Sequence, residues 1–275
     1  MIGAIIGDIC GSRFEADNIK TKDFELMPLM KGCRLTDDSI MTMAIALAII
    51  DCHWGNGTFE ELKERAIFRM QEGGRGYPNA GYGPRFYRWI FSSNPKPYNS
   101  YGNGAAMRVS PCGFAARSLQ EAIDMADAVT EVTHNHPEAL KAAEIVAAVI
   151  FLARSGKNMT ELKDYVEKHY CTLNFTLDDI RPTYSFDVSC QGSVPVALEA
   201  FFEATDFEDA IRNAISVGGD SDTIAAIVGG MAEAKWGVPQ DIRHRAELFL
   251  NKKQKELIEE FESQAWTDSG MTPLY

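Results

Sequence analysis

Several features that mark common classes of protein are missing from this sequence of 275 residues. It has no basic block, and its formal net charge is -12, which argues against a protein that binds nucleic-acid backbones. No uncharged apolar run reaches the length of a membrane span, and Asp8 follows the first apolar residues too early for a signal peptide. We therefore expect neither a nucleic acid nor a membrane as a partner.

Cysteine pairs of the CxxC type are missing as well. The six cysteines are scattered, several of them within apolar segments: Cys10, Cys33, Cys52, Cys112, Cys171 and Cys190. Such a distribution is typical of reduced residues in the core of a cytoplasmic protein rather than of a disulfide framework or a zinc site.

Alternation of polar and apolar residues, the pattern of a half-buried strand, is nearly absent; only residues 183–190 read as an extended segment. Helix signals recur instead. A capping residue is followed three positions later by Glu in four places: Thr58 with Glu61, Ser118 with Glu121, Asn158 with Glu161, and Thr205 with Glu208. Pro137 and Pro239 stand where first-turn prolines belong. These patterns predict an all-α fold, a single compact multi-helix domain covering residues 1–275.

Three glycines, Gly3, Gly7 and Gly11, recur at a spacing of four near the start of the chain. Glycine costs about 1 kcal/mol in a helix interior, so three on one face indicate the close approach of another backbone. The GxxxxGK[ST] pattern of a phosphate loop does not occur.

Two acidic clusters stand where apolar helices should begin. The first is Thr36-Asp37-Asp38-Ser39 and the second is Asp220-Ser221-Asp222-Thr223. One interpretation is helix capping, because acids satisfy free N–H groups and complement the helix dipole. The other is a cation site. If the clusters meet, each pair of carboxylates at ~4 Å costs about 4 kcal/mol at an effective dielectric of ~20, and a hard cation such as Mg²⁺ or Mn²⁺ would relieve that cost.

Five motifs, in order along nearly the whole chain, resemble the ADP-ribosylglycohydrolase family. They are residues 3–8 with 11–15 (GAIIGD and GSRFE), 36–39 (TDDS), 101–108 (YGNGAAMR), 133–137 (THNHP) and 219–226 (GDSDTIAA). The resemblance implies a compact all-α domain with a two-metal centre in a cleft, which agrees with the helical prediction.

The resemblance also implies a role for each cluster. Two Mg²⁺ or Mn²⁺ ions would be held by Thr36, Asp37, Asp38, Asp220, Asp222 and Thr223. It implies catalytic roles for Asp37, Asp38 and Asp222 together with Glu15, which would act as an acid/base or would orient the attacking water. Asp8 belongs to the same motif as Glu15, but a hydrogen bond to a buried helix end explains it equally well.

The glycine-rich segment Ser100-Tyr101-Gly102-Asn103-Gly104 matches the family's loop for the phosphates of ADP-ribose. A glycine-rich turn that opens a helix presents free N–H groups, which can bind a pyrophosphate without many basic residues. The resemblance places His134 near the bound nucleotide, whereas His136, before Pro137, is expected to cap a helix. Tyr77 and Tyr101 are candidates for stacking on adenine, or for local packing.

The resemblance thus implies a metal-dependent hydrolase that cleaves the glycosidic bond between ADP-ribose and an acceptor and releases ADP-ribose. The substrate would be an ADP-ribosylated protein or a small ADP-ribosyl compound. Two alternatives stay open: a non-catalytic ADP-ribose-binding relative, and another metal-dependent nucleotide hydrolase. The acceptor linkage, the choice between Mg²⁺ and Mn²⁺ and the oligomeric state do not follow from the sequence.

Overall fold

The structure, a computed structural model, describes residues 1–15, 17–29, 32–52 and 57–269, with side chains only to residue 265. The first seven helices are α1 (Ile2–Gly11), α2 (Asp37–Asp51), α3 (Phe59–Gly76), α4 (Pro84–Ile90), α5 (Ser110–Ala115), α6 (Leu119–Glu131) and α7 (Pro137–Arg154). The other seven are α8 (Met159–His169), α9 (Leu177–Ile180), α10 (Cys190–Phe202), α11 (Phe207–Ser216), α12 (Ser221–Trp236), α13 (Gln240–Glu247) and α14 (Lys252–Ser269). A short 3₁₀ turn, η1 (Asn103–Ala105), precedes α5.

The predicted all-α class is confirmed, since no strand forms within the described ranges. The segment expected to be extended forms only one isolated antiparallel bridge, between Gly102 and Ser189. None of the helices in the described segments combines the length and hydrophobicity that a membrane span requires. The predicted domain limits include residues 270–275, which lie outside the described residues.

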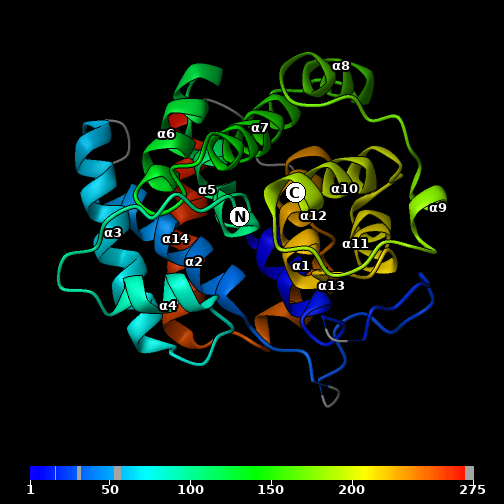
Figure 1. Cartoon of the computed structure of the whole chain (residues 1–275), viewed down its shortest axis with the longest axis horizontal. Coiled ribbons are helices and arrows are strands. Elements are labelled where there is room, and N and C mark those ends of the chain that lie inside the picture. Colours follow the sequence, from blue (N-terminus) through cyan, green and yellow to red (C-terminus); the bar gives the residue numbers. More distant parts are fainter. Residues whose placement is uncertain (16, 30–31, 53–56, 270–275) are drawn as a thin grey trace.

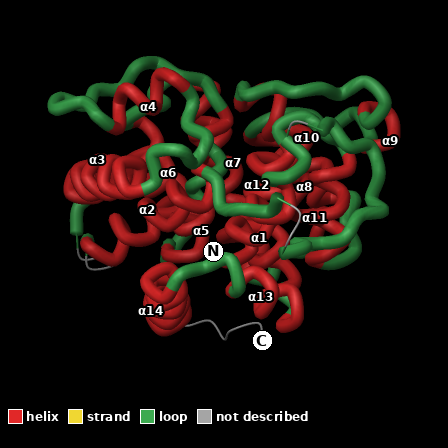
Figure 2. The backbone as a smooth tube through the Cα atoms, turned by 90° about the horizontal axis from the view of Figure 1, so that it is seen from below, coloured by secondary structure: helices red, strands yellow, loops and turns green. Residues whose placement is uncertain are grey.

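The centre of the fold is the pair α1 and α12, which run side by side (Figure 1, Figure 2). The predicted close approach at the glycine stripe is confirmed. A methyl group at Gly3 would lie 2.3 Å from the carbonyl oxygen of Gly229, and one at Gly7 would lie 1.9 Å from that of Ala225. Because only hydrogen atoms separate the two backbones, any larger residue on this face of α1 would force the helices apart.

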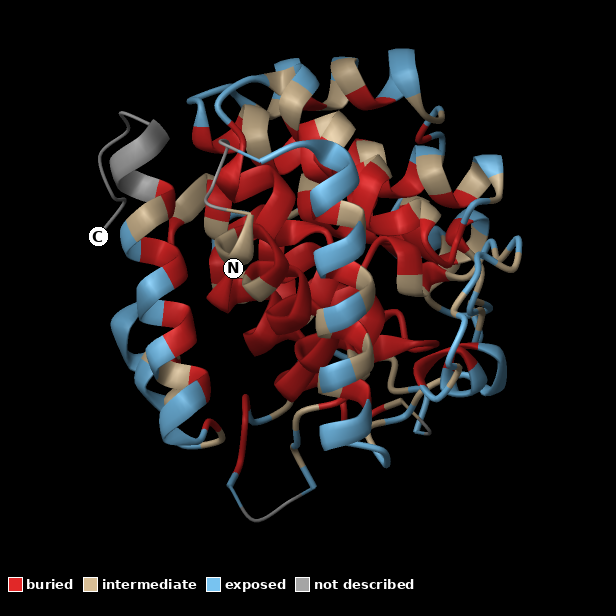
Figure 3. Ribbon diagram, turned by 90° about the vertical axis from the view of Figure 1, so that its left-hand side faces the viewer, coloured by how far each residue is buried: buried red, intermediate tan, exposed pale blue. Residues whose placement is uncertain are grey.

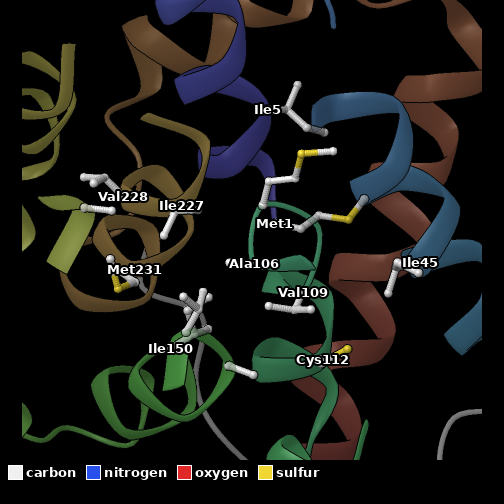
Figure 4. Close-up of a cluster of buried hydrophobic side chains, with 14 of the residues drawn as sticks. Met1, Ile5, Ile45, Ala106, Val109, Cys112, Ile150, Ile227, Val228 and Met231 are labelled. Carbon is white, nitrogen blue, oxygen red and sulfur yellow. The ribbon is translucent and has the colours of Figure 1, made fainter. Parts of the chain in front are cut away.

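One continuous hydrophobic core surrounds this pair. Side chains of α1, α2, α5, α7 and α12 meet in the part drawn in Figure 4, which includes Ile5, Ile45, Val109, Ile150 and Ile227. All five are at most 1% exposed, and burial of such a side chain contributes about 1.5–3 kcal/mol. Figure 3 shows buried residues throughout the interior and exposed residues on the outer faces of the peripheral helices.

The helix caps largely follow the sequence. Both halves of the capping box are present at Thr58 and Asn158, and the Ser118 side chain accepts from the Glu121 N–H. The prediction at Thr205 was wrong by one residue: Asp206 caps α11 and accepts from the Asp209 N–H. An ionised carboxylate is a stronger acceptor than a hydroxyl, so the neighbouring Asp takes the cap. Pro137 occupies the first turn of α7 as expected, whereas Pro239 is the residue before α13.

Both acidic clusters open helices that pack against α1. α2 begins at Asp37 and α12 at Ser221, and α1 contacts both helices. The second half of α1 therefore lies between the two helix N-termini, and it brings together two clusters that are more than 180 residues apart in the sequence.

Candidate active site

The first cluster is fixed by a carboxylate from α1. Asp8 Oδ2 accepts hydrogen bonds from the backbone N–H of Thr36 at 2.9 Å and of Ser39 at 3.1 Å, and the Thr36 hydroxyl donates to Asp8 Oδ1 at 2.6 Å. Asp8 thus satisfies the N-terminus of α2 from another helix. The capping interpretation of the clusters was wrong for Thr36 and Asp220, because neither side chain caps its own helix.

The two clusters do meet. Carboxylate oxygens of Asp8, Asp38 and Asp222 lie within 4.8 Å of one another, and so do those of Glu15, Asp220 and Asp222. Asp222 belongs to both groups, so the two groups are adjacent and share one carboxylate. This arrangement offers two neighbouring positions for a cation, which is what a dinuclear site needs.

The remaining predicted ligands lie close by but outside these two groups. The Thr36 hydroxyl oxygen lies 3.0 Å from Asp38 Oδ2, and the Thr223 side chain is hydrogen-bonded to Asp220. Asp37 faces the same cavity, next to Gly81. The assignment of these residues as metal ligands stays a prediction.

Burial of like charges dominates the electrostatics of this site. Burial, followed by the charge of Asp222, raises the pKa of Asp38 well above its usual value, and burial followed by Asp220 does the same for Asp222. Burial and Asp8 raise the pKa of Asp37 to about 7, and burial and Asp220 raise the pKa of Glu15. Such a group of carboxylates requires protons or a cation.

The donor set fits a hard divalent cation. Asp38 Oδ1 is buried and has no hydrogen-bond partner among the residues that the structure describes, although buried carboxylate oxygens are normally satisfied. Carboxylate and hydroxyl oxygens are the ligands that Mg²⁺ and Mn²⁺ prefer. Asp38 belongs to one of the two carboxylate groups, where a bound ion would be the partner of its unsatisfied oxygen.

A cavity of about 500 Å³ opens over the acidic groups. One end is acidic, with Glu15, Asp37, Asp38, Asp220, Asp222 and Thr223. The rest of the wall combines aromatic, basic and glycine-rich parts: Tyr82, Arg85, Phe86, Tyr98, Arg108, His134, Phe186, Ser100, Gly102, Asn103 and Gly104. The cavity therefore joins a carboxylate site to a wall that can bind the aromatic and anionic parts of a nucleotide.

The glycine-rich loop reaches the cavity in a different manner from the expected one. The side-chain amide of Asn103 donates to Asp220 at 2.7 Å and to Ser193 at 3.0 Å, so this residue orients a carboxylate of the acidic site. Its backbone N–H donates to Val188 O, and the Gly102 N–H donates to the Ser100 hydroxyl. The expectation that these two N–H groups are free was wrong, because residues 187–189 and the Ser100 side chain bind this turn. Phosphate binding by the loop stays a prediction.

The two tyrosines proposed for adenine lie elsewhere. Tyr101 is 52% exposed and packs its ring edge against His136, and it does not line the cavity. Tyr77 lines a separate cavity between α2, α3 and α14, where its hydroxyl accepts from Asn251. The aromatic residues that do line the main cavity are Tyr82, Phe86, Tyr98 and Phe186.

The two histidines have different surroundings; the expected cap at His136 is confirmed, and contact of His134 with a nucleotide stays a prediction. His136 caps α7 by accepting from the Glu138 N–H. His134 is buried, lines the cavity and lies near the rings of Phe86 and Tyr98. Burial, followed by the charges of Arg108 and Arg85, lowers the pKa of His134 well below its usual value, so its imidazole is neutral at pH 7.

Sequence reasoning missed Asp8 as a member of the acidic groups and missed the aromatic and basic wall. A sequence signal for Asp8 existed, because it stands in the same motif as Glu15 and directly after Gly7 of the glycine stripe. Arg108 ends the quoted motif at residues 101–108, whereas the only sign for Phe86 was its position after the glycine-rich segment that ends at Gly83.

Residues 1–271 match the family model described as ADP-ribosylglycohydrolase. The chain is 26% identical over 309 residues to ADP-ribosylhydrolase ARH3 of Xenopus tropicalis, with 87% of each chain covered. It is 27% identical over 278 residues to ADP-ribosylarginine hydrolase Tri1 of Pseudomonas putida (strain GB-1), covering 86% of this chain and 70% of that protein.

The fold has a solved counterpart. A chain of a structure titled "ADP-ribosylglycohydrolase-related protein complex" superposes with a TM-score of 0.70 at 22% identity, covering 96% of this chain and 95% of the other. The likeness extends over the whole helical architecture.

Proposed function

Because the chain belongs to the ADP-ribosylglycohydrolase family, we propose that this hydrolase cleaves the glycosidic bond between the terminal ribose of ADP-ribose and an acceptor. The observation that carries the proposal is the pair of carboxylate groups that share Asp222 at one end of a 500 Å³ cavity. The rest of that cavity has the size and polarity to hold a nucleotide-sized ligand.

We propose that two Mg²⁺ or Mn²⁺ ions bind at these groups. The ions would be held by Asp38, Asp220 and Asp222 of these groups, together with Thr36, Asp37 and Thr223 beside them. There they would neutralise the carboxylates and would supply Lewis-acid polarisation of the terminal ribose.

Glu15 is the candidate base. Its carboxylate lies beside Asp220 and Asp222 and faces the cavity, and burial together with the charge of Asp220 raises its pKa, which makes it a stronger proton acceptor than an ordinary carboxylate. In the reaction a water oxygen bonds to the anomeric carbon, and the bond from that carbon to the acceptor breaks. Glu15 takes a proton from the water and passes it, directly or through solvent, to the departing acceptor heteroatom, which regenerates the Glu15 carboxylate. The products are free ADP-ribose and the unmodified acceptor.

The opposite wall supplies binding energy at a distance from the bond that breaks. Arg85, Phe86 and His134 line it, and interactions with remote parts of a substrate hold the reacting atoms in place. In this proposal the nucleotide half of ADP-ribose lies along this wall and the terminal ribose lies over the carboxylates.

The substrate in this proposal is an ADP-ribosylated protein or a small ADP-ribosyl compound. The relatives named ARH3 and Tri1 share similar identity with this chain, and only the latter carries arginine in its name.

A cytoplasmic location is supported by the six cysteines, all of which are unpaired.

A linkage panel tests the proposal. Arginine-linked, serine-linked and acetyl-linked ADP-ribose are each incubated with the wild-type protein, with Asp222→Asn and with the control Asp241→Asn, whose carboxylate is 69% exposed on α13. We expect at least one linkage to release ADP-ribose with the wild type and the control, and at least 100-fold slower release with Asp222→Asn. No turnover of any linkage, together with ADP-ribose binding, would instead identify a non-catalytic binding protein.

A further inference from the structure

A chain of hydrogen bonds runs from a buried arginine to the histidine of the cavity. Arg108 is 1% exposed, and its Nη2 donates to the Thr133 hydroxyl at 2.7 Å and to Val129 O at 3.3 Å. The Thr133 hydroxyl in turn lies 2.7 Å from Nδ1 of His134. Thr133 is fully buried and His134 is 5% exposed, so water does not compete for these bonds.

The direction of each bond follows from the groups involved. A guanidinium group can only donate, so the Thr133 oxygen accepts from Arg108. The Thr133 hydroxyl has one hydrogen and two possible acceptors, and the shorter contact, 2.7 Å to His134 Nδ1 against 3.4 Å to Thr130 O, favours Nδ1. With Nδ1 as the acceptor, the neutral ring carries its proton on Nε2.

The other side of the ring faces the glycine-rich turn. A methyl group at Gly102 would lie 3.6 Å from His134 Nε2, and one at Gly104 would lie 3.4 Å from it. No group of the described residues hydrogen-bonds to Nε2, although the ring lines the cavity. The Nε2–H group thus remains available to a ligand between two residues that have no side chain to block it.

The groups packed around the ring favour its neutral form. Phe86 and Tyr98 place their rings 6.5 and 5.8 Å from it, and the nearby charges are those of Arg108 and Arg85. A positive imidazole beside two guanidinium groups would be repelled, and no carboxylate hydrogen-bonds to it.

We infer that Arg108 and Thr133 are positioning residues that hold His134 as a neutral Nε2–H donor, directed at a hydrogen-bond-accepting oxygen of the ligand in the cavity. A phosphate or ribose oxygen of ADP-ribose is such an acceptor. Arg108, which is 1% exposed at the cavity wall, acts on the ring through Thr133. The inference goes beyond the proposed function, because it concerns the state of the ring before any ligand binds.

The state of the ring can be measured on the wild-type protein alone. The chain has five histidines, and ¹⁵N labelling of histidine with a long-range ¹H–¹⁵N correlation spectrum distinguishes the two tautomers and the charged form of each ring. A His134→Gln spectrum assigns the signals by the set that disappears. We expect an unprotonated Nδ1 and a protonated Nε2 for His134 from pH 6 to 8. A protonated Nδ1, or a charged ring at pH 7, overturns the inference.

Substitutions at Thr133 test the connection. Thr133→Val removes the hydroxyl at nearly constant volume, and Thr133→Ser retains it. Thr130→Val is the matched control, because the Thr130 hydroxyl is buried and has no hydrogen-bond partner in the described part of the chain. We expect Thr133→Val to change the His134 signals and to weaken ADP-ribose binding about 5- to 30-fold by calorimetry, the effect of 1–2 kcal/mol. Thr133→Ser and Thr130→Val should both stay within about threefold of the wild type.

The outcomes separate this inference from the proposed function. Wild-type signals and affinity in a folded Thr133→Val protein overturn the positioning role. If Thr133→Val does not fold, the tautomer of His134 in the wild-type spectrum and the ADP-ribose affinity of Thr133→Ser test the positioning role instead. A wild type that does not bind ADP-ribose contradicts the proposed function, while its spectrum still supports or overturns the assigned tautomer.

Discussion

The contact between α1 and α12 leads to a prediction whose size can be worked out from the structure. In Gly7→Ala the added methyl group would meet Ala225 O at 1.9 Å, whereas ordinary contacts of this kind lie at 3.4–4 Å. The obstructing atoms are helix backbone and have no alternative rotamer. The two helices must therefore separate by about 1 Å or more, and overpacking of this kind costs about 3 kcal/mol, the upper part of its usual range.

Alanine also stabilises a helix by about 1 kcal/mol relative to glycine. The net loss is then about 2 kcal/mol, which corresponds to a fall of roughly 4–8 °C in Tm for a domain of this size. Asp8 follows Gly7 directly, so the separation also moves one carboxylate of the acidic groups away from α12. We expect the gain in Tm on adding Mn²⁺ to be smaller in the variant than in the wild type.

Differential scanning calorimetry with and without Mn²⁺ measures both effects. Gly73→Ala is the matched control, because it also lies within a helix, but the three atoms nearest to its methyl group belong to side chains, the closest being that of Ile40 at 3.4 Å. The control should be neutral or slightly stabilised. A Gly7→Ala protein as stable as the wild type would refute the claim that the glycine stripe sets the distance between α1 and α12.

Three further predictions concern charge and capping. Asp38→Asn removes a buried negative charge, so the variant should have a higher Tm than the wild type in EDTA. Mn²⁺ at a thousandfold excess over Kd should stabilise the wild type by about 4 kcal/mol, and the variant should lose most of this stabilisation. Equal stabilisation of both proteins by Mn²⁺ would contradict the metal site. Asp127, half-buried beside Glu144, has a pKa raised to about 7, so its folded form binds a proton more tightly than its unfolded form and stability falls as pH rises from about 4 to 7. Asp127→Asn should therefore be more stable than the wild type by about 1 kcal/mol at pH 8, after allowance for solvent screening, and equal to it near pH 4 in urea titrations; a constant difference would count against this pairing. Thr58→Ala should lower stability by about 1 kcal/mol through loss of the α3 capping box, and an unchanged urea midpoint would argue against that box.

Much of the helical architecture was accessible from local sequence signals. The capping boxes at Thr58 and Asn158 and the glycine stripe of α1 were predicted from spacing alone, because they depend on residues close in sequence. The cap at Thr205 was displaced to Asp206, since two adjacent capping residues compete and local spacing does not rank them.

The site was predictable only in part. That the two acidic clusters meet followed from the family resemblance, since nothing in their own sequence specifies that both helices begin beside α1. Asp8 was left undecided because it caps α2 from a different helix, an interaction between residues 28 apart. The aromatic wall was missed for the same reason: Phe86 and Phe186 line one cavity through tertiary packing, and neither lies in a motif.

The most direct test of the central claim, that the two acidic clusters form one metal-dependent hydrolytic centre, is mass spectrometry of the products. The wild-type protein is incubated with an ADP-ribosylated acceptor after complete metal removal and again after addition of Mn²⁺ or Mg²⁺. The account predicts free ADP-ribose and intact acceptor with metal, and neither product without it. Full activity after metal removal, or the appearance of AMP and a ribose-phosphate product in place of ADP-ribose, would contradict it.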